Sequence, residues 1–207
     1  MSATATQPDS RTRLLDAAMQ VIRAQGYSGT TVDDICSAAG LTKGAFFHHF
    51  ESKEELAVAA AEHFAQMAER LFGAAPYREL ADPLDRVLGY IDFRAAILAG
   101  PIPGFTCLLG TMVQEGYETH PAIRSACDRY ISAHAAEVAK DIAAAKVLYA
   151  PAAKWSPESL ALYTQAVLQG AFVLAKAKGG PEVARDCVAH LRRYFLQLFH
   201  RPTSKEE

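Results

Sequence analysis

Apolar residues recur every three or four positions along most of the chain, which is the spacing of amphipathic helices. The first such face ends at Gly26 and consists of Leu14, Leu15, Ala18, Val21 and Ile22. No segment keeps the strict apolar–polar alternation of a half-buried strand. The pattern therefore predicts an all-α protein.

Capping signals divide the first quarter of the chain into short helices. A capping-box variant begins the second helix after Thr31, and a full Ser-x-x-Glu capping box begins the fourth after Ser52. Between them, Gly40 ends the second helix and Thr42 caps a third. These elements predict a small helical domain over residues 1–55, followed by a larger one over residues 56–207.

Prolines and glycines separate longer helices in the larger domain, because Pro favours the first turn and Gly follows the last. The motif AGPIPG at residues 99–104 is read as a break, and Gly179-Gly180-Pro181 as another. With these boundaries the sequence predicts about nine helices in all. Those of the larger domain are expected near residues 52–71, 82–98, 105–117, 121–142, 157–178 and 183–199.

Two short helices around Gly40, after a longer first helix, fit a helix-turn-helix whose second helix enters a DNA major groove. Its first turn must be small and polar to approach base edges, and Phe46 and Phe50 can hold it to the preceding helix. Lys53 is placed to reach a phosphate. The residues expected to contact double-stranded operator DNA are Thr31, Thr42, Lys43, Gly44, Ala45, Phe47, His48 and Lys53.

The segment TTVDDICSAAGLTKGAFFHHFESKEEL, residues 30–56, resembles the DNA-binding signature of the TetR/AcrR repressors at nearly every fixed position. The main departure is Phe47, where the family usually has a tyrosine whose hydroxyl bonds a phosphate. The resemblance implies a homodimer, an operator with two half-sites, and a C-terminal domain that binds a small, largely apolar effector. It also implies a repressor that the effector releases from DNA.

Charge leaves a structural reading of the motif open. The whole chain has a net charge of −2, and residues 1–56 carry five basic and seven acidic side chains, whereas DNA-binding domains are usually basic. Asp33, Asp34, Glu54 and Glu55 lie in first turns of helices, where they favour the helix dipole. A helical interaction protein without a DNA role is the alternative.

The four cysteines are widely spaced and form no CxxC pair, which indicates reduced thiols rather than a disulfide framework or a zinc site. Cys107, before Leu-x-Gly, is similar to a thiol that senses electrophiles in one branch of the family, although Thr106 replaces the usual glycine. Plain core packing is the competing interpretation, and an all-helical thiol enzyme is a third.

No Gly-rich phosphate loop and no HExxH motif occurs, so we expect neither a cofactor nor an enzyme. His48 and His49 point about 100° apart on a helix and cannot chelate one metal ion well. We therefore expect no metal site.

An aromatic-rich set of residues is the candidate lining of an effector cavity; such stripes are usually plain core, and the fold analogy brings the two interpretations level for the set. Its members are Tyr90, Phe93, Phe105, Cys107, Leu108, Met112, Tyr117, Tyr130, His134 and Trp155. The last two helices resemble the family's dimer-forming pair. The residues expected in that interface are Gly170, Ala171, Leu191, Phe195 and Leu198.

The N-terminal sequence MSATATQPDS has no apolar core of a signal peptide and reads as a short disordered arm. No apolar run is long enough to span a bilayer. We therefore expect a cytoplasmic protein with no membrane partner.

Overall fold

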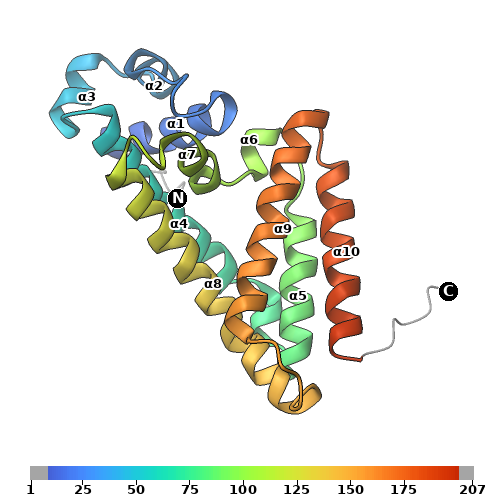
Figure 1. Cartoon of the computed structure of the whole chain (residues 1–207). Helices are drawn as coiled ribbons and strands as arrows, with labels where there is room; N and C mark the ends of the chain where they lie inside the picture. The colour runs from blue at the N-terminus through green and yellow to red at the C-terminus, as the bar shows by residue number, and fades with distance from the viewer. Residues whose placement is uncertain (1–8, 201–207) are drawn as a thin grey trace, which may run out of the picture. The chain divides into compact units, whose positions relative to one another are not determined.

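The computed structural model describes residues 9–200 and is entirely helical over that range, which confirms the all-α prediction (Figure 1). The expected arm over residues 1–10 lies outside the described residues, except for Asp9 and Ser10, which cap and begin the first helix. The elements are α1 (Ser10–Gln25), α2 (Val32–Ala39), α3 (Lys43–His49), α4 (Lys53–Gly73), the 3₁₀ helix η1 (Pro76–Glu79), α5 (Pro83–Ala96), α6 (Ile102–Phe105), α7 (Leu108–Gly116), α8 (Pro121–Tyr149), α9 (Pro157–Lys178) and α10 (Glu182–Leu198).

The chain forms two compact units. The N-terminal unit comprises the described residues up to Met67 together with residues 108–128, and the C-terminal unit comprises residues 68–107 and 129–200. Helices α4 and α8 therefore contribute to both units. These two units do not coincide with the two domains expected from the sequence, which meet between residues 55 and 56. The division into a DNA-binding domain and a ligand-binding domain at that boundary stays a prediction.

In the N-terminal unit, α1 packs against α2, α3 and α7. Its core contains Leu14, Ile22, Ile35, Phe46 and Leu56, none of which is exposed to solvent. Each of these residues lies on the apolar stripe of its own helix, so burying them together joins α1, α2, α3 and the start of α4 into one body.

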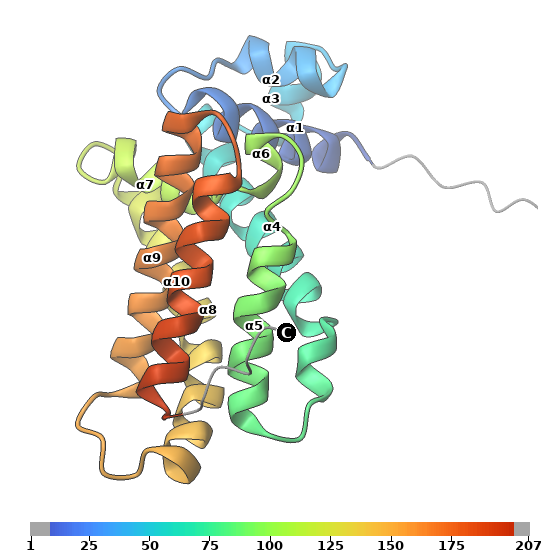
Figure 2. The same ribbon diagram turned by 90° about the vertical axis from the view of Figure 1, so that its right-hand side faces the viewer.

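In the C-terminal unit, α9 and α10 lie side by side and α5 packs against α10 (Figures 1 and 2). The shared core includes Leu84, Ile91, Ala175, Val188 and Phe195. By length and composition alone α9 would be apolar enough to cross a membrane, but nearly half of its most apolar stretch is buried in the protein. Helix α9 also exposes Leu162, Tyr163, Val173 and Leu174 to solvent.

Two short elements were not anticipated from the sequence. The motif expected as a break contains α6, because Pro101 and Pro103 occupy the N-cap and first turn, where a missing N–H is tolerated. The backbone is extended at Thr106, so the helix expected from Phe105 begins instead at Leu108. The 3₁₀ helix η1 likewise begins with a proline, Pro76.

Candidate functional site

The turn between α2 and α3 depends on Gly40. Its backbone is left-handed, with φ 62° and ψ 40°, a conformation that favours glycine. The turn closes with a 2.9 Å hydrogen bond from the Leu41 N–H to the Cys36 carbonyl. The Arg13 guanidinium of α1 donates to the Ala39 carbonyl at 2.6 Å and so joins the turn to α1.

Helix α3 is held at its two ends by different means. The Thr42 hydroxyl caps the first turn by accepting the Ala45 N–H at 3.2 Å. Phe46 is fully buried, and its ring lies 5.9 Å from that of Phe50, which is also buried. These contacts agree with the expected role of the two phenylalanines in holding α3 to the unit.

The opposite face of α3 is open to solvent. Lys43, Gly44 and His48 are exposed, and Phe47 has 58% of its surface exposed, which is unusual for a phenylalanine. A Cβ placed on Gly44 would meet no atom nearer than the Thr42 hydroxyl at 3.7 Å. The structure thus brings most of the predicted DNA-contacting residues together on one exposed surface, here called the α3 face.

Two members of the predicted set are engaged in local interactions. Lys43 forms a 3.0 Å ion pair with Asp33, but both side chains are exposed and such pairs contribute about 0–1 kcal/mol, so a phosphate can compete for Lys43. The Thr31 hydroxyl donates to the Asp34 carboxylate at 2.7 Å and accepts the Asp34 N–H at 3.1 Å. The Thr31 side chain therefore caps the N-terminus of α2, and its predicted contact with DNA stays a prediction.

His49 is also engaged within the unit. Its Nε2 lies 2.6 Å from the Ser10 hydroxyl, whereas His48 is exposed. Over residues 9–200 no three His, Cys, Asp or Glu side chains gather in a way that could hold a metal ion.

Lys53 differs from the expectation that its ammonium is free to reach phosphate. The ammonium donates to the Tyr27 carbonyl at 3.0 Å and to the Thr30 carbonyl at 2.8 Å. It also lies 4.3 Å from the centre of the Tyr27 ring. Two of its three N–H bonds are thus used to join the start of α4 to the segment between α1 and α2.

Replacing Lys53 by methionine is expected to lower the free energy of unfolding by about 2 kcal/mol, because hydrogen bonds to a charged group are lost and two buried carbonyls are left unpaired. Chemical denaturation measures this change. Lys43→Met removes the same charge from an exposed pair and should leave stability unchanged. If Lys53→Met instead kept its stability and showed a smaller salt dependence of DNA binding, Lys53 would contact a DNA phosphate as first expected.

Helix α7 contributes to the N-terminal unit, which no sequence pattern had predicted. The Glu115 carboxylate accepts the Ser28 N–H at 2.7 Å, 87 residues away in sequence. The His120 ring meets the Tyr27 ring edge-on at 5.1 Å. These contacts hold the α1–α2 loop in place. No local sequence motif predicts contacts between residues so far apart in the chain.

Some of the residues predicted to line an effector cavity are not in the C-terminal unit. Leu108 and Met112 are fully buried in residues assigned to the N-terminal unit, and Tyr117 is exposed there. Their burial is explained by core packing of α7. The C-terminal unit's candidate site is therefore described without them.

The C-terminal unit contains a buried polar cluster. The Tyr90 hydroxyl lies 3.0 Å from His134 Nε2 and accepts the Gln165 side-chain N–H at 3.2 Å. The Phe72 ring lies 4.9 Å from the His134 ring. Tyr90 and His134 were both predicted site residues; Gln165 was missed because a single glutamine on an apolar helix carries no motif.

His134 is neutral at physiological pH. Burial, and then the positive charges of Arg94 and Arg78, lower its pKa from 6.5 to about 4. Since its Nε2 must then accept the Tyr90 hydroxyl proton, the ring proton is assigned to Nδ1.

The lowered pKa of His134 predicts acid sensitivity. Below pH 6.5 the unfolded chain binds a proton that folded His134 binds only near pH 4, so stability falls as the pH drops through this window. The expected loss between pH 7 and pH 5 is about 2 kcal/mol at 1.36 kcal/mol per pH unit. Chemical denaturation at both pH values measures the free energy of unfolding. Between pH 7 and pH 5 it should fall by about 2 kcal/mol less in His134→Gln than in the unaltered protein, and an equal fall in both proteins would contradict the assignment.

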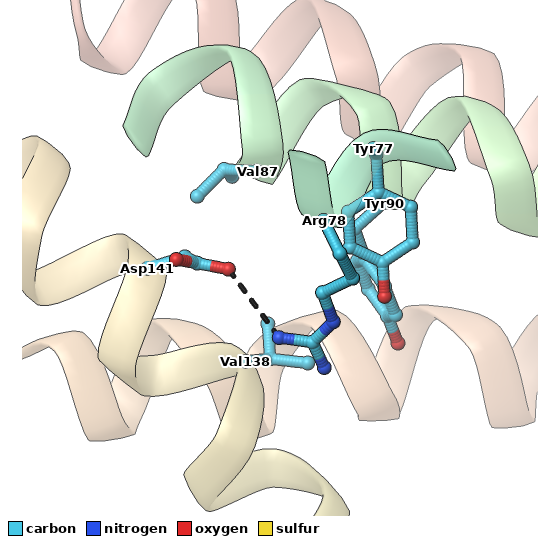
Figure 3. Close-up of a pocket in the computed structure, with 6 residues that line it drawn as sticks. All are labelled: Tyr77, Arg78, Val87, Tyr90, Val138 and Asp141. Atoms are coloured by element: carbon cyan, nitrogen blue, oxygen red, sulfur yellow. Dashed lines mark ion pairs between the residues drawn. The ribbon is translucent and has the colours of Figure 1, made fainter. Parts of the chain in front are cut away.

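Beside this cluster the C-terminal unit has a small, partly open hollow with room for about one water molecule (Figure 3). It is lined by Tyr77, Arg78, Val87, Tyr90, Val138 and Asp141. Asp141 pairs with Arg86 at 2.7 Å and with Arg78 at 3.7 Å. The hollow thus combines aromatic and aliphatic walls with a charged rim.

The other predicted effector residues lie at varying distance from the cluster. Phe93 packs edge-on against Phe72 with ring centres 5.6 Å apart. Trp155 packs on Phe199, and Tyr130 is half-buried beneath the Arg129 guanidinium. Phe105 and Cys107 pack with the core of the unit, so core packing accounts for the burial of Cys107, and a sensing role for this thiol stays a prediction.

The predicted dimer residues need a correction. Ala171, Leu191 and Phe195 are buried in the core of their own chain, so their side chains are not available to a partner. Leu198 is half-buried, and its place in an interface stays a prediction. Gly170 is exposed, and a Cβ there would meet nothing within 4 Å. The apolar residues that α9 does expose are Leu162, Tyr163, Val173 and Leu174.

Comparison with known proteins agrees with these features. Residues 14–60, which contain the helix-turn-helix, match the family described as bacterial regulatory proteins, tetR family. A TetR transcriptional regulator from Chloroflexus aurantiacus J-10-FL has a similar structure over 91% of this chain and 94% of its own, with a TM-score of 0.78 and 26% identity. The helix-turn-helix segment thus matches the tetR family, and the chain shares the fold of a TetR transcriptional regulator.

Two similar proteins are named as HTH-type transcriptional repressors. DhaR of Mycobacterium sp. (strain GP1) is 33% identical over 51% of this chain and 51% of its own length. NemR of Escherichia coli (strain K12) is 31% identical over 60% of this chain and 62% of its own. The chain thus matches about half to three-fifths of the length of these two relatives.

Proposed function

We propose that this chain is a transcriptional repressor that binds operator DNA as a homodimer and is released by a small-molecule effector. The α3 face carries the proposal: a short helix held by buried Phe46 presents Lys43, Gly44 and exposed Phe47 to solvent. A DNA groove provides both apolar sugar and base surface and phosphate.

In this function α3 enters the major groove with its first turn toward the bases. The absence of a side chain at Gly44 lets the backbone approach closely, and Lys43 supplies charge to the phosphates. Two copies of α3 in a dimer would be spaced by about one DNA turn, roughly 34–36 Å, and read two half-sites. A bacterial regulator of this kind acts in the cytoplasm.

The apolar surface of α9 supports a homodimer. Leu162, Tyr163, Val173 and Leu174 recur at helical spacing around exposed Gly170, whose missing side chain would let a second helix approach. Tyr194 of α10 extends this surface, its ring lying 5.3 Å from that of Tyr163. We refer to these residues as the α9 face.

Leu174→Arg is expected to convert the dimer to a monomer at micromolar concentration, because a charge would be buried without a partner. Light scattering coupled to size exclusion measures the mass. Val147→Arg is the matched control, since Val147 is 72% exposed but lies on α8 outside the α9 face. A dimer that survives Leu174→Arg, or is lost in Val147→Arg, would contradict the assignment.

The test of the function is a gel shift with the DNA that flanks the gene for this chain. We expect a specific complex that resists excess unrelated DNA and weakens steeply as salt increases. Equal affinity for the flanking and the unrelated DNA, or no complex, would reject the proposal and favour a helical interaction protein. The relatives named above are regulators, which gives the thiol-enzyme alternative no support.

A further inference from the structure

One large aromatic side chain on the α3 face is open to solvent although it is held in place. Phe47 has 58% of its surface exposed, yet its ring meets that of fully buried Phe46 edge-on, with ring centres 5.1 Å apart. Aromatic rings prefer this arrangement, which restrains the orientation of the Phe47 ring. The α3 face therefore presents an apolar surface that needs little reordering when it meets a partner.

The direction of Phe47 around the helix axis follows from helix geometry. At about 100° per residue, Phe47 projects between Lys43 and Gly44, roughly 40° from the first and 60° from the second. Along the axis it lies about 4.5 Å beyond Gly44, at ~1.5 Å per residue. The exposed ring is thus next to the stretch of backbone that has open space beside it and is proposed to approach the base edges.

The Phe47 ring has no hydrogen-bonding group, which limits what it can contact in a DNA major groove. The base edges there present nitrogen and oxygen donors and acceptors, and one apolar group, the C5-methyl of thymine. An apolar ring placed against a polar edge or a phosphate would remove water without supplying a partner, which costs free energy. Of the groups that identify a base pair, the thymine methyl is therefore the one that suits Phe47.

The polar neighbours of Phe47 suit the phosphates that border a groove. Lys43, one turn earlier, is exposed, and its 3.0 Å pair with exposed Asp33 is open to competition from a phosphate. His48, the next residue, is exposed as well, and its imidazole can donate a hydrogen bond. An apolar ring that projects between two such groups matches a double helix, in which the thymine methyls lie between two charged strands.

Building on the proposed function, we propose that Phe47 reads the C5-methyl group of one thymine in each operator half-site. The methyl packs on the exposed ring, and the contact adds no hydrogen bond and no charge. Lys43 positions α3 through a phosphate, which carries no sequence information, and Phe47 supplies part of the selectivity. Because a homodimer reads two half-sites, the same thymine is required twice, at positions related by the twofold symmetry of the operator.

Uracil lacks only the C5-methyl group of thymine and keeps the same hydrogen-bonding edge, so DNA that contains deoxyuridine is the probe. Symmetric pairs of thymines in the flanking DNA are replaced in turn and each DNA is tested in a gel shift, and one pair should show the effect. Burial of one methyl corresponds to about a fourfold difference in affinity, so this pair should weaken binding about fifteenfold. If no pair changes the affinity by more than about twofold, the proposal is overturned.

The variant Phe47→Ala connects the methyl effect to this residue. Its affinities for the thymine and the uracil operator should differ by less than about twofold, because the ring that contacts the methyl is gone. His48→Ala is the matched control, since it removes another exposed ring from α3 and should keep the difference of about fifteenfold. A methyl effect of the same size in Phe47→Ala as in the unaltered protein would assign the contact to another residue and overturn the proposal.

Salt dependence gives a second readout. Phe47→Ala should leave the slope of log affinity against log salt unchanged, whereas Lys43→Met should reduce it by about one unit per protomer. A reduced slope in Phe47→Ala would mean a lost phosphate contact and overturn the proposal. A specific complex that binds thymine and uracil DNA equally well would reject the thymine contact and keep the proposed function, and no specific complex with thymine DNA would reject both.

Discussion

Replacing Phe46 by alanine is expected to lower the free energy of unfolding by about 3–5 kcal/mol, because a fully buried ring is lost and a cavity remains. That is a large part of the 5–15 kcal/mol that typically separates folded from unfolded domains. The N-terminal unit should therefore melt at a lower temperature, and operator binding should be lost with it. Chemical denaturation followed by circular dichroism measures the stability.

The adjacent Phe47 provides the matched control. Its ring is 58% exposed, so Phe47→Ala should change stability by less than about 0.5 kcal/mol. Operator affinity should nevertheless fall about tenfold, because the ring lies on the α3 face. If Phe47→Ala destabilised the protein and kept full operator affinity, the side of α3 that carries Phe47 would not be the side that faces DNA.

Replacing Gly44 by leucine is expected to abolish specific operator binding while the protein stays folded. The space beside Gly44 is open within the chain, and leucine is a better helix former than glycine, so stability should be equal or slightly higher. In the groove the same side chain would hold α3 away from the bases. Affinity should fall at least a hundredfold, toward the non-specific level, in a gel shift at fixed salt.

Gly44→Ala adds one methyl group and should give an intermediate loss. Gly73→Leu is the control for the chemical change, since Gly73 also has open space around it but lies at the end of α4. Full operator binding by Gly44→Leu would mean that the first turn of α3 does not approach the bases. The helix-turn-helix would then have no role in recognising a sequence.

Local signals made the N-terminal helices predictable. Caps act on residues three positions away, so Thr31 and Thr42 could be read from the chain, and both cap as expected. The burial of Phe46 and the exposure of Phe47 follow from helix periodicity once the caps are placed. The resemblance of residues 30–56 to the family added DNA binding, which the acidic charge of this segment would not have suggested.

What the sequence could not predict depends on distant partners. Lys53 carries a charge that suits phosphate, and only the fold shows the carbonyls that it meets. Helix α9 is apolar around most of its circumference, so its pattern does not say which face is buried, and the interface prediction chose Ala171 from the inner one. The Tyr90 hydroxyl meets His134 and Gln165, which lie 44 and 75 positions away in the chain, and no local motif connects them.

The hydrogen bond from Ser28 to Glu115 affects how the DNA-binding segment can be studied alone. A truncated protein that stops after α4 would keep every residue of the helix-turn-helix and lose the carboxylate that satisfies the Ser28 amide, as well as the imidazole against Tyr27. Such a fragment would keep the α3 face, but its α1–α2 loop would be less firmly held. A fragment for DNA-binding experiments that keeps the native α1–α2 loop must therefore include α7 and the start of α8 as well as the first four helices.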